Sequence, residues 1–312
     1  MYLGIEIGGT KLQLVLGNES AEIIQRVRLN VERSKGGEGI RYQISSALPG
    51  LLEGKLLKGV GVGFGGPVNW QTGKIACSHQ IEGWSEFPIS EWLFELTKAP
   101  VRVDNDANTA ALAEALLGSG IGFNPVFYIT MGSGVGGGLV VENRIYHGAV
   151  PGEAEIGHLR LGKDGRILEE SCSGWAVDRK IREALASREN SLLKTLVTAE
   201  GGEARHLATA VQRADPVAMR ILQETCDDLA FGLSHVIHLC HPQSVVLGGG
   251  LSLMGELLVS TVERFLANYL MEAFYPGPRI ALAKLGEDVV PRGALLLARE
   301  AGEAHKQVSV HR

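Results

Sequence analysis

The fold of this chain depends most on the stretch Val101-Arg102-Val103-Asp104-Asn105-Asp106-Ala107-Asn108-Thr109-Ala110. Its first three residues alternate apolar and charged side chains, which predicts the end of a β-strand. Strong helix formers follow over residues 110–117 and predict a helix. Between them, two Asp and two Asn side chains stand within residues 104–108. Helix capping needs only one such side chain, so the others indicate a functional site, and strand-to-helix turns are where α/β sheets bind ligands.

Composition and charge bound the class of protein. The chain has 312 residues, which allows two domains or one large one. A content of 45% hydrophobic and 21% charged residues is typical of a packed globular protein. The net charge of −5, with no long basic run, argues against a nucleic-acid surface. Residues 115–141 are uncharged but interrupted by glycines and by Asn124-Pro125, so we expect a loop and a hairpin there and no membrane helix.

The cysteines and the first residues predict a cytoplasmic protein. Cys77, Cys172, Cys226 and Cys240 are scattered and form no CxxC pair, which indicates reduced, buried thiols. Residues 1–6 lack the basic region with which a signal peptide begins.

Two glycine-rich turns each connect a pair of apolar strands. Residues 2–17 place Gly8-Gly9-Thr10-Lys11 between two such runs, which predicts a hairpin. The turn also offers bare backbone N–H groups, a hydroxyl and a cation, which suit a phosphate, although a plain hairpin is the alternative. Residues 127–145 repeat the pattern around Gly132-Ser133-Gly134 and the glycines that follow, which indicates a duplicated unit.

The second glycine turn is not a dinucleotide-binding motif. Gly132, Gly134 and Gly137 match GxGxxG, but that motif must open a helix, and here an apolar strand pattern continues from Leu139. A protein-kinase glycine loop is also carried by a hairpin, but neither of the kinase motifs V-A-I-K and H-R-D follows.

Two further strands are predicted to end in glycine turns. Residues 58–64 carry alternating glycines, which suggests close packing on one face, and they lead into Gly65-Gly66-Pro67-Val68. Residues 243–247 predict a buried strand that ends in the turn Gly248-Gly249-Gly250. Such a turn lets a flat ligand or a phosphate approach the backbone, although a tight turn that simply requires glycine explains it as well.

Helices fill much of the remaining chain. A helix over residues 38–48 should stop at Pro49-Gly50. We expect another over residues 251–268, and a final one over residues 293–301. The polar tail, residues 305–312, is expected to fray.

Carboxylates and an imidazole gather in a stretch punctuated by glycine. Glu155 and His158 stand three positions apart, and Glu169 follows. A single His is more often structural than functional. For a His flanked by carboxylates in a loop, however, a structural role and a ligand-binding role explain the pattern equally well.

Taken in order, these motifs resemble the ROK family (repressors, open reading frames and sugar kinases) along nearly the whole chain. The matching pieces are the glycine turns, the Asp104–Asn108 segment and the Glu155–Glu169 region. The resemblance implies an actin-like, hexokinase-type ATPase fold, with two α/β domains around a cleft. We expect a small N-terminal domain over residues 1–115, on which a C-terminal helix over about residues 293–312 packs back, and a large domain over residues 116–292.

The resemblance implies ATP-dependent phosphorylation of a free hexose, with Asp106 as the general base that accepts the proton of the attacking hydroxyl. Glucose is the default substrate, while fructose and N-acetylated hexosamines are alternatives. The side chains and turns expected to bind the sugar are Gly66, Asn105, Asp106, Glu155, His158 and Glu169. Those expected to bind ATP are Gly8, Gly9, Thr10, Lys11, Gly132, Ser133, Gly134, Gly248, Gly249 and Gly250.

The chain departs from the family pattern in two places. Glu6 stands where the family usually has Asp, and we expect its carboxylate to contact Mg²⁺ through water. Between His158 and Glu169 the family usually has a cysteine-rich zinc loop, but residues 159–168 contain no cysteine, and Asp164-Gly165 predicts a tight turn. The sequence therefore predicts a protein without zinc.

Two other functions were weighed. A non-catalytic sugar-binding protein is one, but Tyr2 already begins the first strand, which leaves no room before it for the DNA-binding module of the family's repressors. An actin-like ATPase without a sugar substrate is the other, and the Glu155, His158 and Glu169 cluster argues against it. The expected partners are therefore a hexose and ATP, without nucleic acid or membrane, and the resemblance implies a homodimer.

Overall fold

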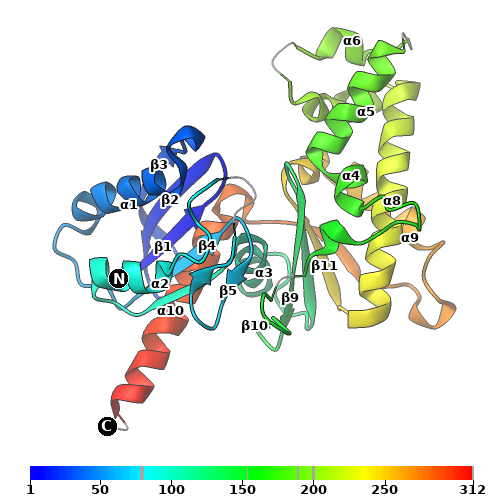
Figure 1. The fold of residues 1–312 in the computed structure, drawn as a ribbon. Helices are drawn as coiled ribbons and strands as arrows, with labels where there is room; N and C mark the ends of the chain where they lie inside the picture. Colours follow the sequence, from blue (N-terminus) through cyan, green and yellow to red (C-terminus); the bar gives the residue numbers. More distant parts are fainter. Residues whose placement is uncertain (78–80, 153, 188–189, 199–200, 311–312) are drawn as a thin grey trace. The chain divides into compact units, whose positions relative to one another are not determined.

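The computed structural model describes residues 1–77, 81–152, 154–187, 190–198 and 201–310 (Figure 1). The chain forms two compact units. Unit 1 comprises Met1–Leu117, Asn143–Ala154 and Glu287–Arg312, and unit 2 comprises Gly118–Glu142 and Glu155–Gly286. The segment Asn143–Ala154, which lies inside the span 116–292, thus belongs with the N-terminal strands. Each unit combines a mixed sheet with helices, which confirms the predicted α/β class.

Unit 1 is built on a sheet with the strand order β3-β2-β1-β4-β7. The first glycine turn joins β1 and β2 in the predicted antiparallel hairpin, and β4 and β7 extend the sheet in parallel with β1. The bounds of the strands are β1 (Tyr2–Ile7), β2 (Lys11–Gly17), β3 (Ile23–Asn30), β4 (Gly59–Phe64) and β7 (Val101–Asn105), with the short strands β5 (Val68–Asn69), β6 (Lys74–Ile75) and β10 (Arg144–Ile145) outside this sheet.

The C-terminal helix α10 (Val289–Val310) packs against β4, β1 and α3 (Asp106–Leu117). The alternating glycines of β4 make this approach possible, because a Cβ atom at Gly61 would lie only 1.9 Å from the backbone oxygen of Ala294. The fraying expected over residues 305–312 is wrong for residues 305–310, because α10 continues to Val310, while residues 311–312 lie outside the described part of the chain. Its last turns contain Ala, Glu, Lys and Gln, which favour helix even when exposed.

Helices α1 (Gly36–Leu52) and α2 (Ile89–Thr97) contribute buried residues to the hydrophobic core that also contains the strands of unit 1. The short 3₁₀ helix η1 (Arg33–Lys35) precedes α1. The predicted stop at Pro49 is wrong: α1 continues through Leu52 and contains Pro49. Leu48 and Leu51 are both buried in the core of unit 1, so burial of the last turn outweighs the cost of the proline.

Unit 2 contains the antiparallel hairpin of β8 (Val126–Met131) and β9 (Val135–Val141). Parallel strands β11 (Ser244–Gly248) and β12 (Arg279–Leu282) continue the sheet beyond β8. Its helices include the long α8 (Pro216–Cys240), which is the yellow helix in Figure 1 and is capped at its N-terminus by the side chain of Asp215. The other bounds are η2 (Ile156–His158), α4 (Leu168–Cys172), α5 (Gly174–Ala186), α6 (Leu193–Leu196), η3 (Glu203–His206), α7 (Leu207–Gln212), η4 (Gly250–Met254), α9 (Glu256–Leu266), η5 (Glu272–Phe274) and η6 (Gly286–Asp288), which leads into α10.

The helix expected over residues 251–268 is divided into two pieces. The 3₁₀ helix η4 ends at Met254, and α9 begins at Glu256. Between them Gly255 takes a left-handed conformation, with φ of +68°, which interrupts a continuous helix.

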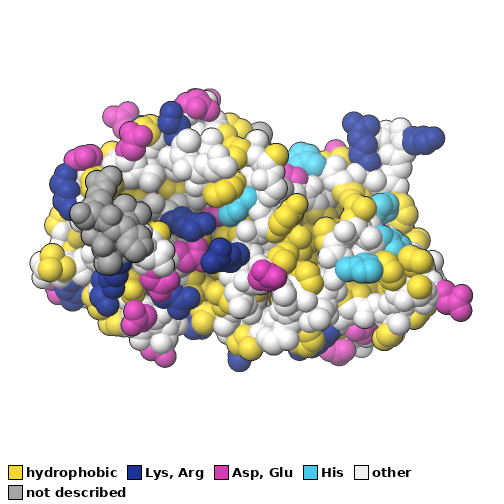
Figure 2. Space-filling view, turned by 90° about the horizontal axis from the view of Figure 1, so that it is seen from below, with side chains coloured by type: hydrophobic (Ala, Val, Ile, Leu, Met, Phe, Trp, Pro, Cys, Tyr) yellow, Lys and Arg dark blue, Asp and Glu magenta, His cyan; other side chains and the backbone are white. Residues whose placement is uncertain are grey.

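The surface charge and the apolar length of the helices bear on the partners expected from composition. On the face drawn in Figure 2, Lys and Arg side chains lie among Asp and Glu rather than in one continuous basic stripe. Within the part of the chain that the structure describes, no helix is both long enough and apolar enough to cross a bilayer.

Candidate active site

Three parallel strands of unit 1 end at the same level. Ile7 at the end of β1 pairs with Phe64 at the end of β4, and Phe64 pairs with Asn105 at the end of β7. The residues that follow are Gly8, Gly65 and Asp106. A Cβ atom at Gly65 would lie 3.4 Å from Oδ2 of Asp106 and 3.6 Å from Cα of Gly8. The structure therefore brings the first glycine turn, the Gly65-Gly66 turn and Asp106 together, at the edge where α/β sheets bind ligands.

Asn105 is the capping residue of helix α3. Its Oδ1 accepts hydrogen bonds from the N–H groups of Ala107, at 2.8 Å, and Asn108, at 3.2 Å. Its Nδ2 donates to the backbone oxygen of Gly66, at 3.2 Å. The helix consequently begins at Asp106, one turn before the run of helix formers at 110–117.

The other polar side chains of the turn divide into two kinds. Asp104 and Asn108 are almost completely buried, and Asn108 Nδ2 donates to Oδ1 of Asp104 at 3.0 Å. Asp106 is partly exposed at the first position of α3, where the positive end of the helix dipole stabilises a carboxylate. Of the two carboxylates in the stretch, Asp106 is therefore the accessible one, whereas Asp104 is buried.

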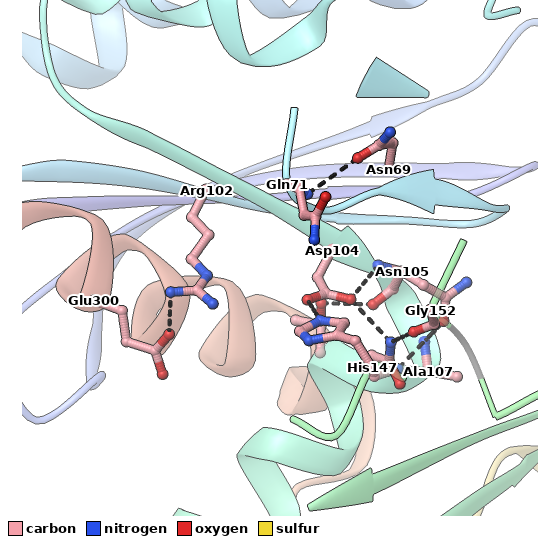
Figure 3. Close-up of polar contacts among 11 residues, drawn as sticks. Asn69, Gln71, Arg102, Asp104, Asn105, Ala107, His147, Gly152 and Glu300 are labelled. Atoms are coloured by element: carbon pink, nitrogen blue, oxygen red, sulfur yellow. Dashed lines mark hydrogen bonds and ion pairs between the residues drawn. The ribbon is translucent and has the colours of Figure 1, made fainter. Parts of the chain in front are cut away.

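Sequence reasoning did not find His147. Its Nε2 lies 2.6 Å from Oδ2 of Asp104 (Figure 3). Its ring stacks on that of Trp70. His147 stands 43 positions after Asp104 in a stretch without regular periodicity, so no local pattern reveals the contact.

The first glycine turn is braced from both sides. Gly8 N–H donates to the backbone oxygen of Lys11 at 2.9 Å, and Arg33 Nε donates to the backbone oxygen of Gly9 at 2.9 Å. Lys11 Nζ lies 3.3 Å from Oε1 of Glu6. The turn thus presents Gly9 and Thr10 on a fixed backbone, as expected for a phosphate-binding turn.

Glu6 is a poor match for a magnesium ligand. Lys11 already pairs with one carboxylate oxygen, and Gln13 Nε2 donates to the other at 2.6 Å. Burial raises the pKa of Glu6, and the neighbouring Lys11 offsets part of that rise. Magnesium prefers ionised and accessible oxygen ligands, and the Glu6 carboxylate is neither fully accessible nor free of protein partners. In the described ranges of the chain, no group of three or more His, Cys, Asp or Glu side chains is arranged to hold a metal ion.

In unit 2, two glycine turns lie beside each other. Gly248 at the end of β11 pairs with Thr130 near the end of β8. A Cβ atom at Gly249 would lie 2.5 Å from the backbone of Met131, and Gly249 has a φ of +78°, so both the space and the conformation require glycine. The turns at Gly132–Gly134 and Gly248–Gly250 are therefore held in contact.

Both turns line one pocket of about 440 Å³ in unit 2. The sequence predicted its glycines but not its walls. Trp175, which is 61% exposed, and the exposed Leu253 offer apolar surface, and Arg205 offers a cation. The lining residues include Met131, Gly132, Ser133, Gly174, Trp175, Asp178, Arg205, Gly250, Leu251, Leu253 and Met254. Apolar surface beside bare backbone amides suits a flat heterocycle that carries phosphates.

The expected sugar-side residues of unit 2 lie on elements that pack against the start of β9. Helices η2 and α4 both contact β9 and each other. Glu155 and His158, at the two ends of η2, have exposed side chains. Glu169 in α4 accepts a hydrogen bond from the N–H group of Val135, which closes the second glycine turn.

The segment between His158 and Glu169 forms a short hairpin. Arg160 pairs with Ile167, and the N–H group of Leu161 donates to the backbone oxygen of Arg166 at 2.9 Å. Cys172 follows in α4 and is completely buried, with its thiol donating to the backbone oxygen of Thr225 at 3.3 Å. Burial raises the pKa of that thiol, which opposes the thiolate form that a metal requires.

The site residues expected from the sequence therefore fall into two sets, each gathered within one unit. Those in unit 1 are Glu6, Gly8, Gly9, Thr10, Lys11, Gly66, Asn105 and Asp106, and those in unit 2 are Gly132, Ser133, Gly134, Glu155, His158, Glu169, Gly248, Gly249 and Gly250.

Comparison with known proteins gives one consistent result. The ROK family model matches residues 2–301. A glucokinase of Halalkalibacterium halodurans is 31% identical, over 96% of this chain and 96% of its own. The crystal structure of a ROK family glucokinase from Streptomyces griseus in complex with glucose and AMPPNP has a TM-score of 0.82 at 30% identity, over 96% of this chain and 99% of that one. A ROK hexokinase structure from Thermus thermophilus has a TM-score of 0.78 at 28% identity, over 97% and 99%. This chain belongs to the ROK family, with its actin-like, hexokinase-type fold.

Proposed function

We propose that this protein transfers the γ-phosphoryl group of ATP to a hydroxyl of a free hexose, with glucose as the default acceptor. The observation that carries the proposal is the position of Asp106, at the aligned ends of three parallel strands and beside Gly8 and Gly65. The similarity to glucokinases over the full chain supports the same reaction.

Asp106 acts as the general base in this proposal. Phosphoryl transfer passes through a loose transition state, so the acceptor hydroxyl needs positioning and a proton acceptor more than a strong base. Asp106 is fixed at the start of α3 and partly exposed, whereas Asp104 is buried and paired. In this proposal, the hexose hydroxyls are bound by Gly66, Asn105, Glu155, His158 and Glu169.

The two units divide the remaining work. Gly8–Lys11 of unit 1 and Gly132–Gly134 of unit 2 bind ATP phosphates through backbone N–H groups. Gly248–Gly250 and the pocket beside it bind the adenosine, with its base against Trp175. Magnesium arrives with the phosphates of ATP, while Glu6 holds Lys11 at the first turn.

The test is ADP release, measured with a coupled assay across glucose, fructose, mannose and N-acetylated hexosamines. We expect one or more of these sugars to accelerate ADP release well above the rate with ATP alone. ATP hydrolysis that no sugar stimulates would indicate an ATPase, and sugar binding without turnover would indicate a sensor.

The setting of the protein is part of the same proposal. The four cysteines are free thiols, which supports a reducing compartment such as the cytoplasm. A homodimer is expected from the family resemblance alone, and light scattering of the purified protein tests it.

A further inference from the structure

His147 lies in a short segment of unit 1 that stands, in the sequence, between two stretches of unit 2. The chain leaves unit 2 at Glu142, contributes Asn143–Ala154 to unit 1, and re-enters unit 2 at Glu155. This segment therefore lies directly before the residues that we assign to sugar binding in unit 2.

The side chain of His147 is held tightly on two sides. Its ring lies 4.3 Å from that of Trp70, centroid to centroid, with 15° between the planes. Its Nε2 lies 2.6 Å from Oδ2 of Asp104, and the two side chains are 7% and 2% exposed. A short contact between two buried polar side chains is strongly directional, so it fixes the Asp104 carboxylate.

Because Asp104 also hydrogen-bonds the turn that carries Asp106, fixing its carboxylate fixes that turn as well. Its other oxygen, Oδ1, accepts from the backbone N–H of Asn105 at 2.9 Å and from Nδ2 of Asn108 at 3.0 Å (Figure 3). Asn108 Nδ2 also donates to the backbone oxygen of Gly152 at 2.8 Å. The segment thus contacts both ends of the turn, with His147 at Asp104 and Gly152 at Asn108. Asp106 stands between these two positions in the sequence.

We propose that His147 is a positioning residue for catalysis: through Asp104 it sets the backbone of Asn105, and with it the direction of the Asp106 carboxylate. The proposal rests on the proposed kinase function, in which Asp106 is the base. His147 itself is almost fully buried and acts on the turn, not on the substrate. Losing the contact lets Asp106 move, and a misplacement of about 1 Å costs on the order of a hundredfold in rate.

Two variants separate the hydrogen bond from the ring stacking. His147→Phe keeps an aromatic ring for Trp70 but removes the nitrogen, and we expect it to lower kcat roughly 10- to 100-fold. The KM for ATP should not change, because the adenosine pocket belongs to unit 2. His147→Gln keeps a nitrogen donor near the same place and should recover most of the lost kcat.

A matched control is available in unit 2. His235 in α8 is half-buried, its Nδ1 lies 2.8 Å from the backbone oxygen of Phe231, and its ring packs against that of Phe231. We expect His235→Phe to keep the wild-type kcat, whatever it does to thermal stability. A fall in kcat that occurs in His147→Phe but not in His235→Phe is then due to the lost contact with Asp104 and not to a general loss of stability.

The outcomes that overturn the proposal are specific. Wild-type kcat in His147→Phe overturns it, as does a His147→Gln variant that is as slow as His147→Phe. If His147→Phe does not fold, His147→Leu, which also lacks the ring nitrogen, should show the same loss of kcat, and wild-type turnover in that variant overturns the proposal. A wild-type protein that phosphorylates no hexose contradicts the proposed function instead, which distinguishes the two failures.

Discussion

The carboxylate of Glu169 accepts a 2.8 Å hydrogen bond from the backbone N–H of Val135. Val135 is the first residue of β9 and directly follows the glycine turn that we assign to ATP phosphates. A residue expected to bind the sugar therefore also shapes a phosphate-binding turn. If Glu169 also binds the sugar as we propose, this contact couples the phosphate-binding turn to the sugar site, and phosphoryl transfer requires the two substrates to be positioned together.

Replacement of Glu169 should therefore affect both substrates. We expect Glu169→Ala to raise the KM for hexose and the KM for ATP together, because the Val135 N–H loses its partner and the turn loosens. Glu169→Gln keeps an acceptor oxygen and should preserve the KM for ATP while weakening hexose binding. Steady-state kinetics with each substrate varied in turn measures both effects. An unchanged KM for ATP in Glu169→Ala would show that the turn does not depend on this contact.

Catalysis should depend on Asp106. We expect Asp106→Asn to fold and to bind hexose but to lose on the order of a hundredfold or more of kcat, the size expected for removal of a general base. Calorimetric titration with the sugar and ADP-release assays measure binding and turnover separately. Near-normal turnover of this variant would rule out Asp106 as the base.

Much of the fold could be predicted because its signals are local. The hairpins around Gly8 and Gly132 and the strand before Gly65 follow from alternating apolar residues interrupted by glycine. Where the prediction failed, the cause was tertiary: burial of Leu51 carries α1 past Pro49, and the left-handed Gly255 divides an apparently continuous helix.

In the candidate site, too, the residues with a local signal could be predicted and those that depend on distant contacts could not. Asp106 stands out because one capping residue cannot account for two Asp and two Asn side chains. In the structure the other three side chains have different roles. Asn105 caps α3. Asp104 contacts His147, and Asn108 hydrogen-bonds both Asp104 and the backbone of Gly152. His147 and Trp175 could not be found from the sequence, because each acquires its role from residues far away in the chain.

Trp175 should determine nucleotide affinity. It lines the pocket beside Gly132 and Gly250 and is 61% exposed, an unusual environment for a tryptophan unless a ligand covers it. Stacking of a base on an aromatic side chain contributes about 1–3 kcal/mol, so we expect Trp175→Ala to raise the KM for ATP roughly tenfold. The KM for hexose should stay the same, and Trp175→Phe should retain most of the affinity. Quenching of tryptophan fluorescence by ADP, lost in Trp175→Ala, provides a measurement independent of turnover.

The buried Glu6 should make stability depend on pH. Burial raises the pKa of Glu6 above its value in the unfolded chain, despite the pairing with Lys11. Between the two pKa values the folded state binds more protons than the unfolded state, so this contribution to stability is complete at low pH and is lost as the pH rises through the folded pKa. Glu6→Gln, which cannot ionise, should lose less stability than the wild type over that window.

Two measurements check the Glu6 prediction. Urea unfolding at a series of pH values compares the two proteins, and the half-buried Glu300, whose pKa is also raised by its partial burial, serves as an internal reference present in both. The magnesium concentration that gives half-maximal activity should be the same in Glu6→Gln and the wild type. A clear rise in that concentration would instead support a water-mediated magnesium contact.

The last prediction concerns zinc in the segment between His158 and Glu169. A structural zinc site is almost always closed by four ligands, usually Cys and His. Residues 159–168 contain no cysteine, and backbone hydrogen bonds close them into a hairpin. Cys172 is the nearest thiol beyond Glu169, but it is buried against Thr225 and its pKa is raised, so forming a thiolate there is unfavourable.

We therefore expect the hairpin itself to orient His158, without a metal. A strong chelator should leave the melting temperature of the nucleotide-free protein unchanged, unlike that of a domain whose folding is coupled to metal binding. Elemental analysis of the purified protein should find zinc well below one equivalent. Gly165→Pro, which breaks the hairpin turn because proline cannot adopt the φ of +92° found there, removes no potential ligand and should weaken hexose binding, because His158 then loses its support. Stoichiometric zinc, or a melting temperature that falls sharply with chelator, would show that this segment holds a metal after all.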